Sequence, residues 1–95
     1  MADDDPHLLV VDDDSRLRTL LRKFLQENGF RVTLASDAED ARAKMQGLAF
    51  DLIVLDIMMP GESGVDFARR VRLSDNVPIL MLTAMGEPEE RIAGL

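Results

Sequence analysis

The sequence predicts an α/β fold with a doubly wound parallel sheet, and two features of the chain support this prediction. Short apolar runs alternate along the 95 residues with segments whose apolar residues recur at helical spacing. One of these runs, residues 52–55, is apolar at every position, which is typical of a strand covered by helices on both faces. Strands that alternate with helices form parallel sheets joined by right-handed crossovers.

The first strand and helix are expected in the N-terminal third of the chain. Residues 8–11 form a short apolar run that ends abruptly in aspartates, which predicts a buried strand. A helix follows, with its N-cap at Asp14 or Ser15. Gly29 is placed to end it as a left-handed residue after the last turn. The apolar face of this helix consists of Leu17, Leu20, Leu21, Phe24 and Leu25.

The second strand and helix follow directly. Arg31–Ala35 alternates between polar and apolar residues, which predicts a half-covered strand at an edge of the sheet. Residues 36–39 read as a capping box in which Ser36 and Glu39 begin the next helix. The apolar face of that helix is expected to consist of Ala38, Ala41, Met45 and Leu48.

Two more strands are expected in the second half of the chain. Residues 51–56 predict the clearest strand, because four apolar residues lie between two aspartates. After a loop, Ser63 caps a third helix. Residues 77–82 predict a fourth buried strand, and a fourth helix begins near residue 87. The third helix is expected to bury Phe67, Ala68 and Val71.

The composition excludes several classes of protein and site. The length fits one domain, residues 1–95, and the absence of cysteine excludes disulfides, iron–sulfur clusters and thiolate zinc sites. His7 is the single histidine, which excludes a cluster of imidazole ligands. No apolar run approaches the ~18 residues of a membrane span. The acidic N-terminus and the net charge of −7 argue against a signal peptide and against direct nucleic-acid binding, so we expect a cytoplasmic domain.

Polar residues follow three of the predicted strands at their carboxyl ends. Asp12 and Asp13 end the first strand, Asp56 ends the third, and Thr83 ends the fourth. In open parallel sheets, ligands bind beyond the carboxyl ends of the strands, at the point where the strand order reverses. If the first and third strands are neighbours, these side chains share one crevice.

Three neighbouring carboxylates favour a divalent cation. At a separation of about 5 Å and an effective dielectric of about 20, each pair repels by roughly 3 kcal/mol. Asp12, Asp13 and Asp56 therefore predict a site for Mg²⁺, with Mn²⁺ as a second possibility. Beside such an ion, an oxygen of Asp56 can attack phosphorus to form an acyl phosphate. The hydroxyl of Thr83 and the backbone N–H of Ala84 are placed to contact the phosphoryl oxygens, although threonine is also common at strand ends for structural reasons alone.

The order and spacing of these segments resemble the receiver domain of bacterial two-component response regulators, from about His7 to Leu95. The resemblance implies the flavodoxin-like strand order 2-1-3-4-5 and a switch controlled by phosphorylation rather than a conventional enzyme. The matching segments are Leu9-Val10-Val11-Asp12-Asp13, Asp51-Leu52-Ile53-Val54-Leu55-Asp56-Ile57-Met58-Met59-Pro60-Gly61, Gly64, and Pro78-Ile79-Leu80-Met81-Leu82-Thr83-Ala84.

The resemblance also implies a role for each site residue. Asp56 matches the phosphoacceptor, and Asp13 matches the direct ligand of Mg²⁺, with Asp12 acting mainly through metal-bound water. Met58 matches the position whose backbone carbonyl binds the metal, and Thr83 matches the switch hydroxyl. The resemblance implies a phosphohistidine of a sensor kinase or phosphotransfer protein as the phosphoryl donor. It further implies Mg²⁺-dependent self-phosphorylation from small phosphodonors and self-dephosphorylation.

The chain departs from the family pattern at its C-terminus. The family's fifth strand, with its lysine, and its fifth helix have no counterpart here, so we expect a receiver domain that is incomplete at the C-terminal end. The strand at residues 77–82 is then an exposed edge, which favours self-association. The segment 78–84 looks most like receivers that precede a winged-helix DNA-binding domain, so we expect such an output domain in the parent protein.

Three other functions can be weighed from the residues. A phosphorylation-independent interaction module could keep the same fold. Loss of the family lysine favours it, whereas retention of Asp12, Asp13, Asp56 and Thr83 argues against it. A Mg²⁺-dependent phosphohydrolase would need an aspartate two residues after Asp56, where the chain has Met58. A nuclease of the toprim type would need a glutamate at the end of the first strand, where the chain has aspartates.

Overall fold

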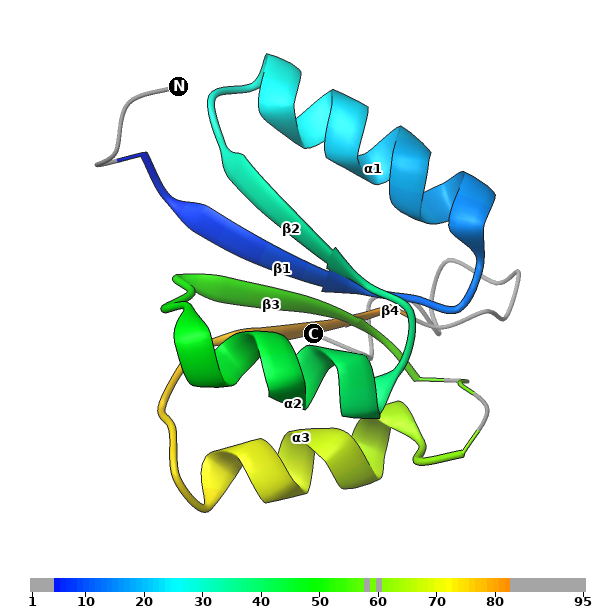
Figure 1. Cartoon of the computed structure of the whole chain (residues 1–95), viewed down its shortest axis with the longest axis vertical. Helices are drawn as coiled ribbons and strands as arrows, with labels where there is room; N and C mark the ends of the chain where they lie inside the picture. The colour runs from blue at the N-terminus through cyan, green and yellow to red at the C-terminus, as the bar shows by residue number, and fades with distance from the viewer. Residues whose placement is uncertain (1–4, 58, 60, 83–95) are drawn as a thin grey trace.

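A computed structural model describes residues 5–57, 59 and 61–82 of the chain. Within these residues, four parallel strands form one sheet in the order β2-β1-β3-β4 (Figure 1). Figure 1 shows α1 on one face of the sheet, and α2 and α3 on the other. The predicted α/β fold with parallel strands and strand order 2-1-3-4 is confirmed. The elements are β1 (His7–Val11), α1 (Ser15–Glu27), β2 (Arg31–Ala35), α2 (Ala38–Gly47), β3 (Leu52–Asp56), α3 (Gly64–Arg72) and β4 (Ile79–Leu82).

The main core lies between the sheet and the α2–α3 layer. Alternate residues of a strand point to opposite faces of the sheet, so Leu9, Ile53 and Leu55 point into this core together. Phe67 of α3 is fully buried among them. The prediction that α3 buries Phe67, Ala68 and Val71 is confirmed.

The opposite face of the sheet is covered less completely. Leu8 and Val10 are buried there, but α1 contains no fully buried residue. Leu20 is 65% exposed and Phe24 is 61% exposed, so the apolar stripe read from the sequence is a half-covered surface.

Local signals set the ends of α1. The Asp14 carboxylate caps it by accepting hydrogen bonds from the backbone N–H groups of Arg16 and Leu17. Gly29 follows the helix with a φ of +90°, where a side chain would be strained, and its N–H donates to the Gln26 carbonyl. The predicted stop at Gly29 is confirmed.

Three boundaries differ from the sequence predictions. Helix α2 is capped by Asp37 rather than by a Ser36–Glu39 box, because the Asp37 carboxylate reaches the N–H of Asp40. Leu48 is the C-cap of α2 and is 46% exposed, so it does not extend the apolar face. Strand β4 begins at Ile79, two residues later than expected, and the predicted helix near residue 87 lies outside the described residues.

The sheet has two edges among the described residues. β2 forms one edge, as the sequence predicted, and β4 forms the other. All four residues of β4 are half-buried rather than buried. Of these, Ile79 and Met81 pack against the core, which places Leu80 and Leu82 on the opposite face.

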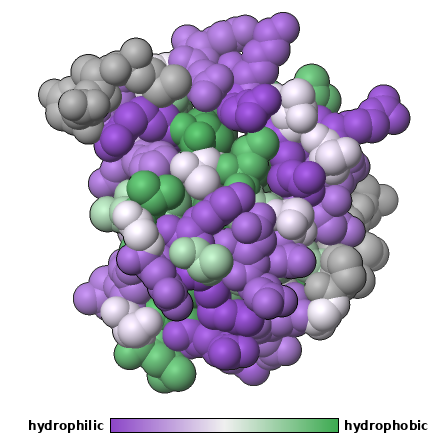
Figure 2. All heavy atoms as spheres, in the orientation of Figure 1, coloured by the Kyte–Doolittle hydropathy of each residue, from purple (hydrophilic) through white to green (hydrophobic). Residues whose placement is uncertain are grey.

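The visible surface is mostly hydrophilic. Figure 2 shows hydrophobic residues in small separated patches over the face drawn in Figure 1. None of the helices formed by the described residues has the length and apolar character needed to cross a bilayer.

His7 lies in a small polar cluster at the amino end of β1. Its Nε2 is hydrogen-bonded to Thr33 Oγ1 at 2.7 Å, and its ring centroid lies 4.6 Å from that of Phe50. Asp51, which directly precedes β3, binds the backbone of His7. Its carboxylate accepts a hydrogen bond from the His7 N–H at 2.8 Å. Burial, followed by the positive charge of Arg31, lowers the pKa of His7 below its ordinary value of 6.5.

This pKa shift predicts a loss of stability in mild acid. Unfolded His7 takes up a proton near pH 6.5, whereas folded His7 resists protonation until the pH is lower. The stability that neutral His7 contributes is therefore complete above pH 6.5 and declines as the pH falls below it. His7→Gln should lose less stability than wild type between about pH 7.5 and 5.5. Urea denaturation at the two pH values measures this, and equal losses would contradict the assignment.

Candidate metal centre

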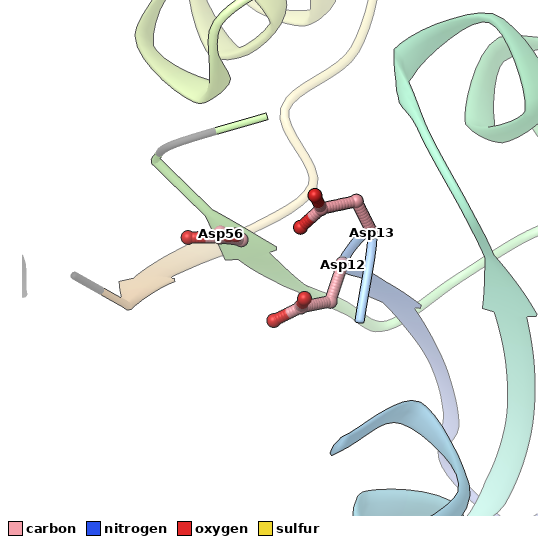
Figure 3. A group of neighbouring side chains, drawn as sticks. All are labelled: Asp12, Asp13 and Asp56. Atoms are coloured by element: carbon pink, nitrogen blue, oxygen red, sulfur yellow. The ribbon is translucent and has the colours of Figure 1, made fainter. Parts of the chain in front are cut away.

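Three aspartates meet where β1 and β3 end. The two strands are parallel neighbours, and their register pairs Val11 with Leu55. Asp12 directly follows β1 and Asp56 is the last residue of β3, so the two lie side by side. One carboxylate oxygen from each of Asp12, Asp13 and Asp56 lies within 4.8 Å of the others (Figure 3). The structure thus brings together the carboxylates that the sequence placed at one edge of the sheet.

The three carboxylates differ in burial. Asp12 is 4% exposed and Asp56 is 8% exposed, whereas Asp13 is exposed to solvent. Burial, aided by the negative charges of Asp13 and Asp14, raises the pKa of Asp12. The N–H of Asp14 and the charge of Arg18 oppose this rise. Two buried carboxylates beside an exposed one form a site that a cation would stabilise.

Hydrogen bonds hold the turn between β1 and α1. The N–H of Asp12 donates to the Ala35 carbonyl at 3.1 Å, which ties the end of β1 to the end of β2. Asp12 Oδ1 accepts from the N–H of Asp14 at 2.9 Å. Arg18 donates from Nη1 to the carbonyl oxygen of Asp12 at 2.7 Å. The backbone and the carboxylate of Asp12 are therefore both fixed.

The segment after β3 turns back against the site. The N–H of Ile57 donates to the Leu82 carbonyl at 3.0 Å, and the N–H of Gly64 donates to the Ile57 carbonyl at 2.9 Å. A Cβ on Gly64 would overlap the carbonyl oxygen of Asp56 and would lie 2.8 Å from Ile57 Cα. Only glycine allows α3 to begin this close to the residue that carries the third carboxylate.

Glu62 fastens the same segment to both helices of the α2–α3 layer. Its carboxylate forms ion pairs with Arg42 of α2 and Arg70 of α3. The Glu62 side chain is 15% exposed, so these pairs are partly shielded from water. Neither Glu62 nor Arg18 can be recognised as a site residue from the sequence, because the partners of both are decided by how the turns fold.

Three residues expected at the site are not among those that the structure describes. Met58, Thr83 and Ala84 lie outside the described residues. The register of the sheet pairs Asp56 with Leu82, the last residue of β4, and Thr83 is next in the sequence.

The donor set suits a hard divalent cation. The described cluster consists of aspartates alone, and carboxylate oxygens are preferred ligands of Mg²⁺ and Mn²⁺. Its location, beyond the carboxyl ends of parallel strands, is where α/β sheets commonly bind ligands.

The chain matches one protein family along almost its whole length. Residues 8–95 match the family described as the response regulator receiver domain. The chain belongs to the response regulator receiver family. Receiver domains are the signal-receiving part of two-component systems, and the family binds Mg²⁺ at an acidic pocket.

Curated relatives share the family. Protein PetR of Rhodobacter capsulatus is 57% identical over 95 residues, which is all of this chain and 40% of the relative. The transcriptional regulatory protein ResD of Bacillus subtilis is 42% identical over 87 residues, covering 92% of this chain and 36% of the relative. The chain thus spans about two-fifths of the length of these relatives.

Solved receiver structures share the fold. The chemotaxis protein CheY4 of Vibrio cholerae superimposes with a TM-score of 0.83 at 36% identity, covering 95% of this chain and 78% of that one. The response regulator TrrA of Thermotoga maritima, solved in complex with Mg²⁺-BeF, gives a TM-score of 0.79 at 39% identity, covering 85% of this chain and 71% of that one. These similarities confirm the flavodoxin-like receiver fold.

The close approach at Gly64 predicts a large effect of a single methyl group. Gly64→Ala should destabilise the fold by about 1–3 kcal/mol, because the new Cβ overlaps backbone atoms that cannot move aside without displacing Asp56. Urea denaturation measures the change in the free energy of unfolding. Gly47→Ala is the matched control, because a Cβ at this helical position meets nothing within 4 Å. Equal stabilities of the two variants would contradict the packing argument.

Proposed function

We propose that this receiver domain is a phosphorylation-controlled switch in which Asp56 accepts the phosphoryl group and the three-aspartate cluster holds Mg²⁺. The observation that carries the proposal is the convergence of three carboxylate oxygens within 4.8 Å at the ends of β1 and β3. Family membership supports the same function. The structure of TrrA with Mg²⁺-BeF is that of a relative, and it suggests that beryllofluoride is a suitable probe for this chain.

Asp56 is the nucleophile in this proposal. One carboxylate oxygen attacks the phosphorus of a phosphohistidine on the donor protein. The new O–P bond forms as the N–P bond breaks, and the imidazole leaves with the electron pair. The product at Asp56 is an acyl phosphate, which water can later hydrolyse to the carboxylate and inorganic phosphate.

The neighbouring residues prepare Asp56 for this reaction. Asp13, the exposed member of the cluster, is the proposed direct ligand of Mg²⁺, and Asp12 acts mainly through metal-bound water. When bound there, Mg²⁺ would supply positive charge that screens the incoming phosphoryl group. We assign the Met58 carbonyl to the metal, and the Thr83 hydroxyl and Ala84 N–H to the phosphoryl oxygens, from the match to the family pattern.

The proposed partners follow from the same reaction. The donor is a sensor histidine kinase or a phosphotransfer protein in the cytoplasm. Relatives such as ResD are named transcriptional regulatory proteins, and this chain spans 36% of ResD. We therefore propose a DNA-binding output domain in the parent protein.

The function is tested by beryllofluoride binding. With Mg²⁺ present, beryllofluoride should shift the amide signals near Asp56 in ¹H–¹⁵N spectra of wild type. Asp56→Asn should abolish this response, because the amide cannot supply the anionic oxygen that beryllium needs. Asp66→Asn, which removes an exposed carboxylate from α3, should respond as wild type does.

Two results of this experiment would contradict the proposal. A wild-type protein that binds Mg²⁺ but ignores beryllofluoride would overturn the phosphoacceptor role and favour a phosphorylation-independent interaction module. A response that persists in Asp56→Asn would place the acceptor at another residue.

The edge strand β4 leads us to propose self-association. β4 pairs with β3 on one side only among the described residues, and its apolar side chains are half-buried. Size-exclusion chromatography with light scattering should give a mass above the monomer at micromolar concentration. Leu80→Lys should shift the mass toward the monomer, because a charge on the edge opposes pairing. A monomeric wild type would contradict this proposal and leave the switch function unaffected.

A further inference from the structure

We propose that Arg18 is a positioning residue of the metal site, and that it sets the orientation of Asp13 through the backbone of Asp12. This inference rests on the proposed Mg²⁺ site. Arg18 lies in the first turn of α1, half-buried, six residues after Asp12. Its Nη1 donates to the carbonyl oxygen of Asp12 at 2.7 Å.

The carbonyl that Arg18 holds belongs to the peptide that joins Asp12 to Asp13. A peptide group is planar, so fixing its carbonyl oxygen also fixes the direction in which the chain continues to the next Cα. The N–H of Asp12 is already bound to the Ala35 carbonyl at 3.1 Å. With both polar backbone groups of Asp12 anchored, the exposed side chain of Asp13 leaves the backbone from a defined position.

Arg18 is itself held rigidly at the start of α1. Its backbone N–H donates to the Asp14 carbonyl at 3.0 Å, and the Asp14 side chain caps the helix. Arg18 therefore makes two hydrogen bonds to the turn between β1 and α1. Its backbone binds Asp14 and its side chain binds Asp12. Helix α1, although it buries no residue completely, is linked in this way to the metal site.

Two effects of Arg18 on cation binding have opposite signs. Its positive charge repels a cation at the cluster, so removing the charge alone would tighten Mg²⁺ binding. Its hydrogen bond orients a proposed ligand, so removing the bond would weaken Mg²⁺ binding. The direct contact is to the backbone of Asp12 rather than to its carboxylate, which favours the second effect.

The decisive variant is Arg18→Met, which keeps much of the side-chain length and loses both the charge and the donors. Residues that orient metal ligands typically contribute 10–100-fold to affinity, so we expect Arg18→Met to bind Mg²⁺ about tenfold more weakly. Mg²⁺ titration followed by amide shifts measures the affinity in the 95-residue chain, which has no Trp or Tyr for intrinsic fluorescence. In metal-free protein, the ¹⁵N shift of Asp13 should also change, since its N–H shares the peptide whose carbonyl loses a donor.

The matched control is Arg22→Met, which removes the same charge one turn further along α1. The exposed Arg22 side chain makes no hydrogen bond or ion pair within the part of the chain that the structure describes. Its loss should leave Mg²⁺ affinity unchanged or slightly tighter, as expected for a charge effect alone. The difference in Mg²⁺ affinity between Arg18→Met and Arg22→Met separates the effect of orienting Asp13 from the effect of removing a positive charge.

Mg²⁺ binding by wild type separates failure of the proposed metal site from failure of the proposed role of Arg18. If wild type does not bind Mg²⁺, the metal site itself is wrong. If wild type binds Mg²⁺ and folded Arg18→Met binds it equally well or more tightly, the positioning role is overturned. If Arg18→Met does not fold, Arg18→Lys takes its place: weaker Mg²⁺ binding at retained charge supports the role, and unchanged binding overturns it.

Discussion

The parallel pairing of β1 with β3 is the constraint on which the rest of the site depends. Carboxylates separated by more than forty positions in the sequence become neighbours because these two strands are adjacent and end at the same level. A change of register by one residue would turn the side chains at the strand ends toward opposite faces. The apolar residues of both strands, buried on both faces of the sheet, resist such a change, so the core enforces the geometry of the acidic site.

The acidic site places carboxylates in the buried interior, where a negative charge is costly. Asp12 and Asp56 are almost fully buried, and burial raises the pKa of Asp12. The backbone N–H of Asp14 and the guanidinium of Arg18 partly compensate at Asp12. A divalent cation would offset the remaining repulsion, so a cluster of this kind suits a metal ion and contributes little to stability by itself.

The two faces of the sheet are stabilised differently. On the α2–α3 face, buried side chains gather around Phe67, and the ion pairs of Glu62 hold the segment after β3 to both helices. On the other face, α1 leaves Leu20 and Phe24 largely exposed and is fastened at its first turn by hydrogen bonds to the β1–α1 turn. Hydrogen bonds therefore link the start of α1 directly to Asp12, whereas no residue of α1 is fully buried.

The sequence by itself determined the alternation of strands and helices, the cap at Ser63, the stop at Gly29 and the candidate aspartates, because these depend on local periodicity and turn chemistry. It narrowed the cap of α1 to Asp14 or Ser15, and the structure decided for Asp14. The sequence misplaced the cap of α2, where Ser36 and Asp37 compete for the same role, and the start of β4, where the Val77 N–H binds the Asp75 carboxylate. Only the tertiary structure decided that Arg18 holds the Asp12 carbonyl, that Glu62 joins two arginines, and that Gly64 lies against Asp56. These contacts depend on how turns from different elements meet in space, which the order of residues along one element does not reveal.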